Sequence, residues 1–170
     1  MMRSRPRQIS LAKRRAFTLV EILMVLMILG IAAAMIAPRL GSMGDIQVSS
    51  AARTLVANME YAQNEAIVTQ QDMTVEFNES FEKYWLADAA GNLLTHPVTK
   101  RDFTVEFPNE RGLQKVEVLS ADFGGNDKVT FDSLGSPSNG GSVMLGADGH
   151  TYRVDVAPVT GRIQVVAINP

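Results

Sequence analysis

The chain contains few residues of the types that perform chemistry. Its 170 residues include no Cys and only two His residues, His96 and His150. A cysteine nucleophile, a disulfide framework and thiolate metal ligands are therefore excluded, and two distant His residues give little material for a zinc site or a catalytic triad. His96 precedes Pro97 and His150 follows Gly149, so we expect a loop residue and an exposed turn residue.

Three polar or glycine-rich patterns partly match known functional motifs, but each lacks residues or a spacing that its motif requires. Asp122-Phe123-Gly124 matches a kinase tripeptide, but no accompanying Gly-rich loop or catalytic loop is present. Gly140-Gly141 lacks the Lys-Ser/Thr of a phosphate loop. Asp122, Asn126 and Asp127 offer oxygen ligands for calcium, yet their spacing is not that of an EF-hand. We predict hairpin turns here, and we expect no enzyme activity, no cofactor and no small-molecule substrate.

The carboxylate whose position most needs an explanation is that of Glu21. It lies in an apolar run, residues 17–37, of roughly 21 residues, which as a helix reaches about 30 Å, the thickness of a bilayer hydrocarbon core. A carboxylate inside such a run costs roughly 2.5 to 3.5 kcal/mol near the helix centre and less near its end. Either Glu21 has a functional partner, or it lies at the interface and favours the helix N-terminus through the macrodipole.

Charge divides the chain at the start of this apolar run. Six of the 16 basic residues precede Phe17 and no acidic residue does, so ten basic residues face all 18 acidic ones from Phe17 onward, a charge of −8. The basic leader is expected to stay in the cytoplasm and the bulk of the chain to lie across the membrane. The acidic body disfavours nucleic-acid binding.

Three hypotheses explain the N-terminus. An ordinary secretory signal would be cut near the small residues 32–34. A twin-arginine signal would use the paired Arg14 and Arg15 before Phe17, although such signals usually have milder apolar regions. In the third hypothesis the apolar helix is retained and Glu21 serves a function.

A second helix is predicted beyond the apolar run. Pro38 cannot donate a helical hydrogen bond, so we expect a kink or a loosening of the chain there. Apolar residues then recur at spacings of three and four, which indicates an amphipathic helix to about Gln70 that packs on a sheet. The apolar positions are Ala52, Leu55, Val56, Met59, Ala62, Ala66 and Ile67.

From Met73 onward the apolar period changes to two, which predicts β-strands. Residues 74–77 and 83–86 form a first predicted hairpin, and Gly91-Asn92 marks a turn after it. Further strands are expected at residues 103–107, 115–119, 129–131, 142–145, 152–156 and 162–166. The pattern predicts an α+β fold in which one long helix covers one face of an antiparallel sheet.

Residues 13–21, Lys-Arg-Arg-Ala-Phe-Thr-Leu-Val-Glu, resemble the type III signal of prepilins and pseudopilins. The resemblance implies that a prepilin peptidase cuts between Ala16 and Phe17 and methylates the new amino terminus of Phe17. It also implies that Glu21 pairs with the amino terminus of a neighbouring subunit during assembly, where a buried acid and a buried amine offset one another's desolvation. The family usually has Gly before the cut, so Ala16 implies slower processing.

The C-terminal half carries a second resemblance. Residues 131–137, Gly140-Gly141, the following strand and residues 158–162 resemble in order the C-terminal region of H-type minor pseudopilins of type II secretion and of FimT-like pilins. Their glycines are expected in tight turns that need a positive φ and leave no room for a side chain. Residues 91–127 resemble no known pattern, and we expect a variable loop and short strands there.

These resemblances imply a pilin-like α+β chain with four parts: a cleaved leader (1–16), a transmembrane and assembly helix (17–38), an amphipathic helix (39–72) and a β-rich periplasmic domain (73–170). We expect a single-pass inner-membrane protein that joins major and minor pseudopilins in the filament of type II secretion. The alternatives are a minor pilin of a type IV pilus, which serves fimbrial biogenesis or DNA uptake, and a simple membrane-anchored binding domain.

DNA uptake can be weighed from the charges near the C-terminus. Arg153 and Arg162 are the only basic residues after Lys128. No cluster is present to bind phosphates, and an acidic body repels the polymer. We therefore expect no nucleic-acid partner.

Overall fold

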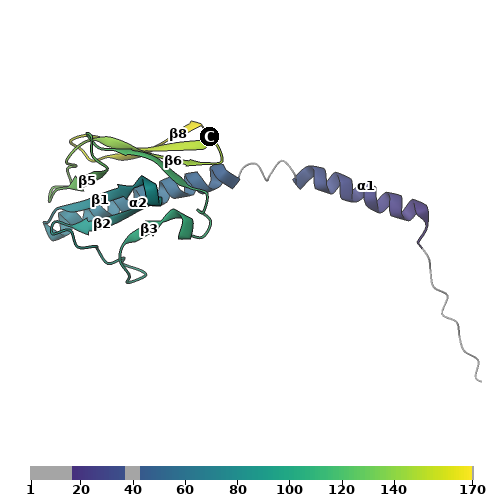
Figure 1. Ribbon diagram of the computed structural model, residues 1–170, viewed down its shortest axis with the longest axis horizontal. Coiled ribbons are helices and arrows are strands. Elements are labelled where there is room, and N and C mark those ends of the chain that lie inside the picture. Colours follow the sequence, from purple (N-terminus) through teal and green to yellow (C-terminus); the bar gives the residue numbers. More distant parts are fainter. Residues whose placement is uncertain (1–16, 37–42, 170) are drawn as a thin grey trace, which may run out of the picture. The chain divides into compact units, whose positions relative to one another are not determined.

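A computed structural model of the chain describes residues 17–36 and 43–169. The chain forms two compact units whose boundary in the sequence lies between Leu40 and Gly41. The first unit holds helix α1 (Leu19–Ile36), and the second holds helix α2 (Met43–Thr69) and all the strands (Figure 1). The leader and the predicted kink at Pro38 lie outside the described residues. No helix in the described ranges combines the length and the apolarity that a membrane span requires.

Helix α2 confirms the predicted amphipathic helix and ends within one residue of the predicted end. Five of its seven predicted apolar positions are fully buried, whereas Val56 is partly buried and Ile67, at the C-terminal end, is 42% exposed. The helix ends at Thr69 because Gln70 takes a left-handed conformation with φ of 56°, and the Gln70 side chain donates to the Ile67 carbonyl oxygen at 2.7 Å. The buried hydrophobic residues of α2 are Val48, Ala51, Ala52, Leu55, Met59, Ala62 and Ala66.

The strands form two antiparallel four-stranded sheets. The first has the order β3-β2-β1-β5, with strands β1 (Met73–Asn78), β2 (Lys83–Asp88), β3 (Thr104–Glu106) and β5 (Lys128–Phe131). The second has the order β4-β6-β7-β8, with strands β4 (Glu117–Asp122), β6 (Gly141–Ala147), β7 (His150–Val156) and β8 (Ile163–Asn169). Two short 3-10 helices, η2 (Glu79–Phe81) and η3 (Phe107–Asn109), follow β1 and β3.

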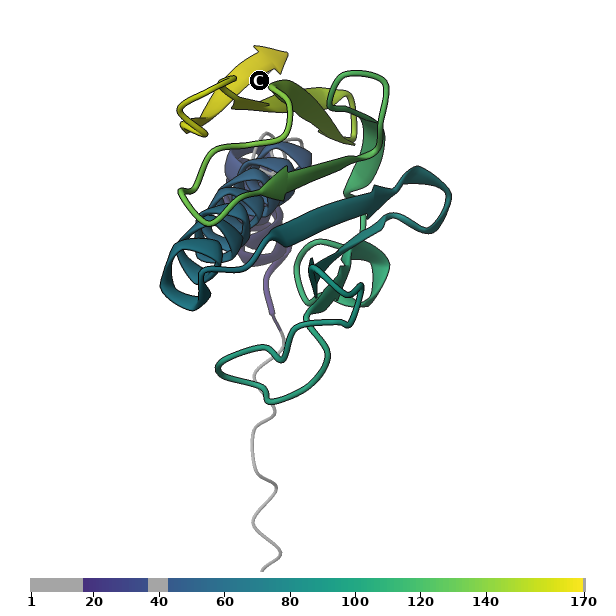
Figure 2. The same cartoon turned by 90° about the vertical axis from the view of Figure 1, so that its left-hand side faces the viewer.

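We predicted that the helix covers one face of a single sheet. The number of sheets was wrong, because the structure has two. Helix α2 contacts strands of both sheets, and Figure 2 shows strands of the second sheet above the helix and strands of the first sheet beside it. Each strand was predicted within a few residues of its place. Period-two alternation shows that a strand has one buried face, but it does not identify the neighbouring strands. The division into two sheets therefore could not be deduced from that pattern.

An aromatic cluster joins the two sheets beside the helix. The ring of Phe77 on β1 lies 5.7 Å from Tyr84 on β2 and 5.9 Å from Phe123, which follows β4. Tyr84 in turn lies 5.7 Å from Phe107 of η3. All four rings are essentially fully buried. These contacts extend one continuous hydrophobic core from α2 across both sheets.

The buried hydroxyl of Tyr84 has one polar partner. The Asn58 side-chain amide on α2 donates to the Tyr84 hydroxyl oxygen at 2.7 Å, so this bond ties the helix to β2. Burial raises the pKa of Tyr84 well above its ordinary value of 10, because the phenolate would lose its hydration. The folded chain therefore holds this proton more tightly than the unfolded chain does.

Tyr84→Phe should lower the free energy of unfolding at pH 7 by about 1 kcal/mol, because the Asn58 amide loses its acceptor. Because the pKa of Tyr84 is higher in the folded than in the unfolded chain, the protonated hydroxyl stabilises the fold fully below about pH 10, the pKa in the unfolded chain. This stabilisation is progressively lost above that pH. Urea unfolding of the full chain in detergent micelles from pH 7 to 12 should show a steeper alkaline loss for the wild type, by up to about 1.4 kcal/mol per pH unit. Equal slopes for the two proteins would contradict this assignment.

Candidate functional site

The described part of the first unit begins at the predicted processing site. Ala16 lies outside the described residues, and Phe17 is the first described residue, with 74% of its surface exposed. Thr18 caps helix α1: the Glu21 backbone N–H donates to the Thr18 carbonyl oxygen at 3.1 Å and to its Oγ1 at 3.2 Å. This N-cap places Phe17 and Glu21 about one helical turn apart.

The Glu21 carboxylate is exposed in the first turn of α1. The helix macrodipole favours a negative charge there. Within the described ranges, its oxygens make no hydrogen bond and no ion pair.

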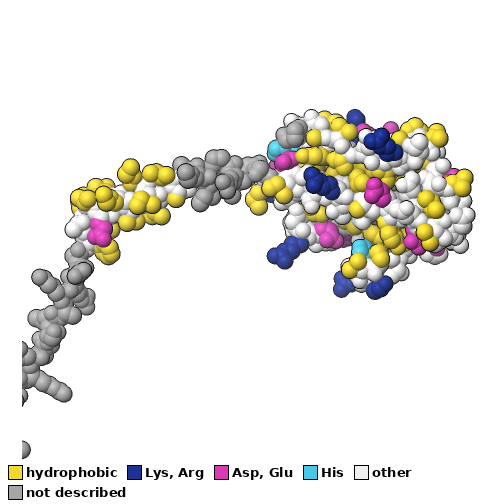
Figure 3. Space-filling model, turned by 180° about the vertical axis from the view of Figure 1, so that it is seen from behind, with side chains coloured by type: hydrophobic (Ala, Val, Ile, Leu, Met, Phe, Trp, Pro, Cys, Tyr) yellow, Lys and Arg dark blue, Asp and Glu magenta, His cyan; other side chains and the backbone are white. Residues whose placement is uncertain are grey.

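The rest of the visible surface of α1 is apolar. Its large side chains from Leu19 to Ile31 are 47% to 76% exposed, and Glu21 is the only charged residue of the helix. Figure 3 shows mostly hydrophobic side chains on its visible described face, with one acidic patch. A helix that is apolar on every side becomes stable only when lipid or other helices surround it. The described side chains of this helix therefore present an almost wholly apolar surface.

The C-terminal motif folds into two turns that α2 holds together. Gly135 and Gly161 have φ of 80° and 63°, as the predicted tight turns require. The Gln63 Nε2 on α2 donates to the Gly135 carbonyl oxygen at 2.7 Å and reaches the Gly161 carbonyl oxygen at 3.5 Å. Helical periodicity gives no sign of these two contacts, because they join Gln63 to residues 72 and 98 positions further along the chain.

At Gly140 and Gly141 the predicted positive φ is wrong, but the predicted lack of room for a side chain is confirmed. Gly141 begins β6, where an added Cβ would clash with the Asp122 carbonyl oxygen and lie 2.7 Å from the Phe123 Cα. A Cβ added at Gly140 would lie 2.7 Å from the Pro158 ring Cδ and 2.8 Å from the Pro158 backbone nitrogen. Close backbone approach, and not turn geometry, therefore requires these two glycines.

Gly141→Ala should destabilise the second unit by about 3 kcal/mol or more, because the new methyl group meets rigid backbone on β4. Gly125→Ala is the matched control: an added Cβ there meets open space, and only its φ of 87° is strained, at a cost of about 1 to 2 kcal/mol. Thermal unfolding of both full-length variants in micelles compares the two costs. A smaller loss for Gly141→Ala than for Gly125→Ala would contradict the close-approach explanation.

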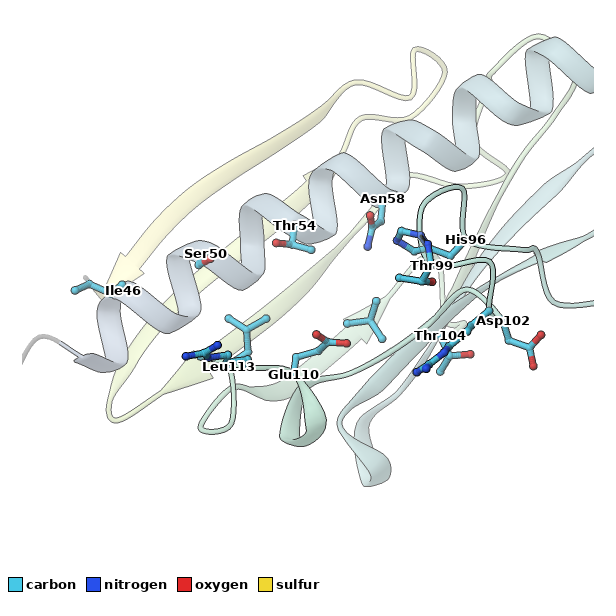
Figure 4. Close-up of a pocket in the computed structure, with 14 residues that line it drawn as sticks. Ile46, Ser50, Thr54, Asn58, His96, Thr99, Asp102, Thr104, Glu110 and Leu113 are labelled. Atoms are coloured by element: carbon cyan, nitrogen blue, oxygen red, sulfur yellow. Dashed lines mark hydrogen bonds between the residues drawn. The ribbon is translucent and has the colours of Figure 1, made fainter.

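A groove of about 600 Å³ with polar and apolar lining residues lies between α2 and the loops around β3. Ser50, Thr54 and Asn58 form its helical wall at four-residue intervals, and Glu110 and His96 stand on the other wall (Figure 4). The His96 Nδ1 accepts the backbone N–H groups of Val98 and Thr99 at 3.1 and 3.2 Å. His96 therefore orders its own loop, which confirms the predicted loop position.

The other chemically interesting residues are structural. His150 is the half-buried first residue of β7 and not the exposed turn residue that we predicted. Asp122 closes a turn by accepting the Gly125 N–H at 2.8 Å, and the Asn126 carbonyl oxygen accepts the Phe123 N–H at 2.8 Å. In the part of the chain that the structure describes, no group of three or more His, Asp or Glu side chains is placed to hold a metal ion.

An apolar N-terminal helix with an early carboxylate, and a second helix packed on antiparallel sheets, define the class of type IV pilin-like proteins. The sequence model of the prokaryotic N-terminal methylation motif matches residues 11–37. The model of the family described as type II transport protein GspH matches residues 51–160. The chain therefore belongs to the GspH family, and the resemblance to H-type pseudopilins is confirmed.

Solved structures share the fold. The minor pseudopilin EpsH from the type 2 secretion system of Vibrio cholerae is 13% identical, with a TM-score of 0.55, and the match covers 73% of this chain and 99% of EpsH. The type IV minor pilin FimU of Pseudomonas aeruginosa strain PAO1 is 15% identical, with a TM-score of 0.51, covering 72% of this chain and 90% of FimU. These matches confirm the pilin-like α+β fold. A search of curated proteins found no significant match.

Proposed function

We propose that this GspH-family protein is a minor pseudopilin that works as a structural subunit of the type II secretion pseudopilus. A prepilin peptidase cuts after Ala16 and methylates Phe17. The apolar helix holds the chain in the inner membrane until it joins other pseudopilins in a filament. The filament then helps to move folded proteins across the outer membrane. The GspH family match supports this function and a structural rather than a catalytic role.

The observation that carries the proposal is the isolated carboxylate of Glu21 near the start of an apolar helix. After cleavage, Phe17 carries the new amino group, which is a cation. In a bundle of packed α1 helices, the amine of one subunit and the Glu21 carboxylate of its neighbour are each costly to bury alone. Pairing offsets that cost, and only a neighbour at the correct axial offset can provide it. Glu21 therefore sets the register of assembly.

The orientation in the membrane follows from charge. All six basic residues that precede Phe17 lie in the leader, which favours the cytoplasmic side. The leader is thus available to a peptidase on that side, and the second unit, residues 43–169, lies in the periplasm. There its loops and strand edges are presented to other pseudopilins.

A minor pilin of a type IV pilus is the second candidate, and the fold similarity to FimU is the observation that favours it. The two functions share every argument from the N-terminal residues and differ in the machine that the subunit serves. Deleting the gene and measuring both secretion and pilus-dependent twitching separates them. Loss of secretion alone supports the first function, and loss of twitching alone supports the second.

Glu21→Gln should leave membrane insertion intact and lower incorporation into filaments by about tenfold or more, because the amide cannot neutralise the neighbour's amine. Secretion should fall with it. The measurement is the amount of the protein in filaments sheared from cells, compared with the amount in the membrane fraction. Glu60→Gln is the matched control, since Glu60 is exposed on α2 and the change is the same. Normal secretion by Glu21→Gln would contradict the role of this carboxylate.

A further inference from the structure

The edges of the two sheets differ in how they are protected. An exposed sheet edge presents unpaired backbone N–H and C=O groups to any extended chain, and proteins usually cover such edges or keep them short. The first sheet ends at β3 and β5, and the second ends at β4 and β8. Strand β3 has only three residues.

Hydrogen bonds from other segments close two of these four edges, those of β5 and β4. On β5, the Thr130 N–H donates to the Ser138 Oγ at 3.2 Å and its carbonyl oxygen accepts the Ser138 N–H at 2.7 Å. On β4, the Val118 N–H donates to the Glu82 carboxylate, and the Ala121 N–H donates to Glu79 Oε1 at 2.9 Å. Side chains and a neighbouring loop thus occupy the places that another strand would take.

Strand β8 is long and apolar, and its outer edge is open. Five of its seven residues are apolar, none is charged, and Val165, Val166 and Ile168 are 38%, 37% and 47% exposed. Across residues 43–169, no hydrogen bond from another segment reaches its outer edge; the Asn169 side chain bonds to Gly149 at the β7 end. A solvent-exposed edge of this composition is the kind that pairs with another strand.

The register of β7 with β8 shows which backbone groups of β8 point away from β7, toward the place of a further strand. The Ala157 N–H donates to the Arg162 carbonyl oxygen at 2.9 Å, so Arg162 faces β7. Backbone groups alternate along an antiparallel strand. Gln164 therefore bonds to its register partner Asp155, whereas the N–H and C=O of Val165 point to the open edge.

We propose that β8 is the docking edge for an extended, apolar strand of a different pseudopilin, an inference that rests on the proposed function. Backbone groups spaced for a β-ladder select an extended chain, and apolar side chains on both faces of β8 select apolar partners. Two copies of β8 would pair about a two-fold axis, which closes the pair and cannot propagate a filament. Head-to-tail pairing of identical copies would need a second long open edge, but β3 has only three residues. Hydrogen bonds from other segments occupy the edges of β4 and β5.

The test uses Val165→Pro, which removes an outward N–H and leaves the ladder to β7 intact. Val165→Thr is the matched control, because it keeps both the N–H and the β-branched shape. Each full-length protein is produced in membranes together with the complete set of pseudopilins of its own secretion system. Co-purification of those pseudopilins should fall about tenfold or more for Val165→Pro and stay unchanged for Val165→Thr. Hydrogen exchange of residues 163–169 should slow about tenfold when the wild type joins the complex.

Unchanged co-purification of a folded Val165→Pro, or unchanged exchange of β8, would overturn the proposal. Protection of β8 in the chain alone, together with the mass of a dimer, would also overturn it, in favour of a second copy. If Val165→Pro fails to fold, as judged by thermal unfolding, Val165→Lys decides, because it keeps the N–H and adds a charge to the edge; unchanged co-purification by that variant would overturn the proposal. If the wild type co-purifies with no pseudopilin, the proposed function itself fails, and this inference fails with it.

Discussion

The second unit depends on one apolar stripe of α2 that must serve as the inner surface for two sheets at once. Four of its seven buried hydrophobic residues are alanines, so backbone from both sheets can approach the helix closely. Leu55 and Met59 fill the space between them. Without this stripe, Val75 and Phe77 of the first sheet and Val154 of the second would lose their cover. The two sheets share a core because they share a helix.

Polar side chains of α2 outside the buried stripe form hydrogen bonds to the surrounding strands and loops. Gln63 bonds to the two turns of the C-terminal motif, the Tyr152 hydroxyl on β7 donates to Asp45 Oδ1 at 2.8 Å, and the Lys115 backbone N–H donates to Gln47 Oε1 at 3.2 Å. These bonds fix the ends of the second sheet relative to the helix. The second unit is therefore a rigid platform, and its free surfaces, the groove beside Thr54 and the open edge of β8, keep a defined geometry.

Local patterns in the sequence predicted most of the elements and little of their arrangement. The spacing of Leu55, Met59 and Ala62 predicted a helix that ends within a residue of its true end, and the alternation around Val75 and Val154 predicted strands. The close approach at Gly141 and the bond from Gln63 to Gly135 depend on contacts between distant segments, which no periodicity encodes. The edge at β8 became visible only when the strand order was known. By contrast, Glu21 was recognisable from the sequence because its chemistry conflicts with its apolar surroundings.

If the chain is a processed filament subunit, protein taken from cells containing the peptidase has a changed intact mass and N-terminal residue. We expect a chain that begins at N-methylated Phe17 and has lost its first 16 residues. A chain that begins near Met35 would instead be an ordinary secreted domain, and a chain that still begins at Met1 would be a simple membrane anchor. Either result would contradict the filament mechanism, because the new amine that Glu21 pairs with would not exist.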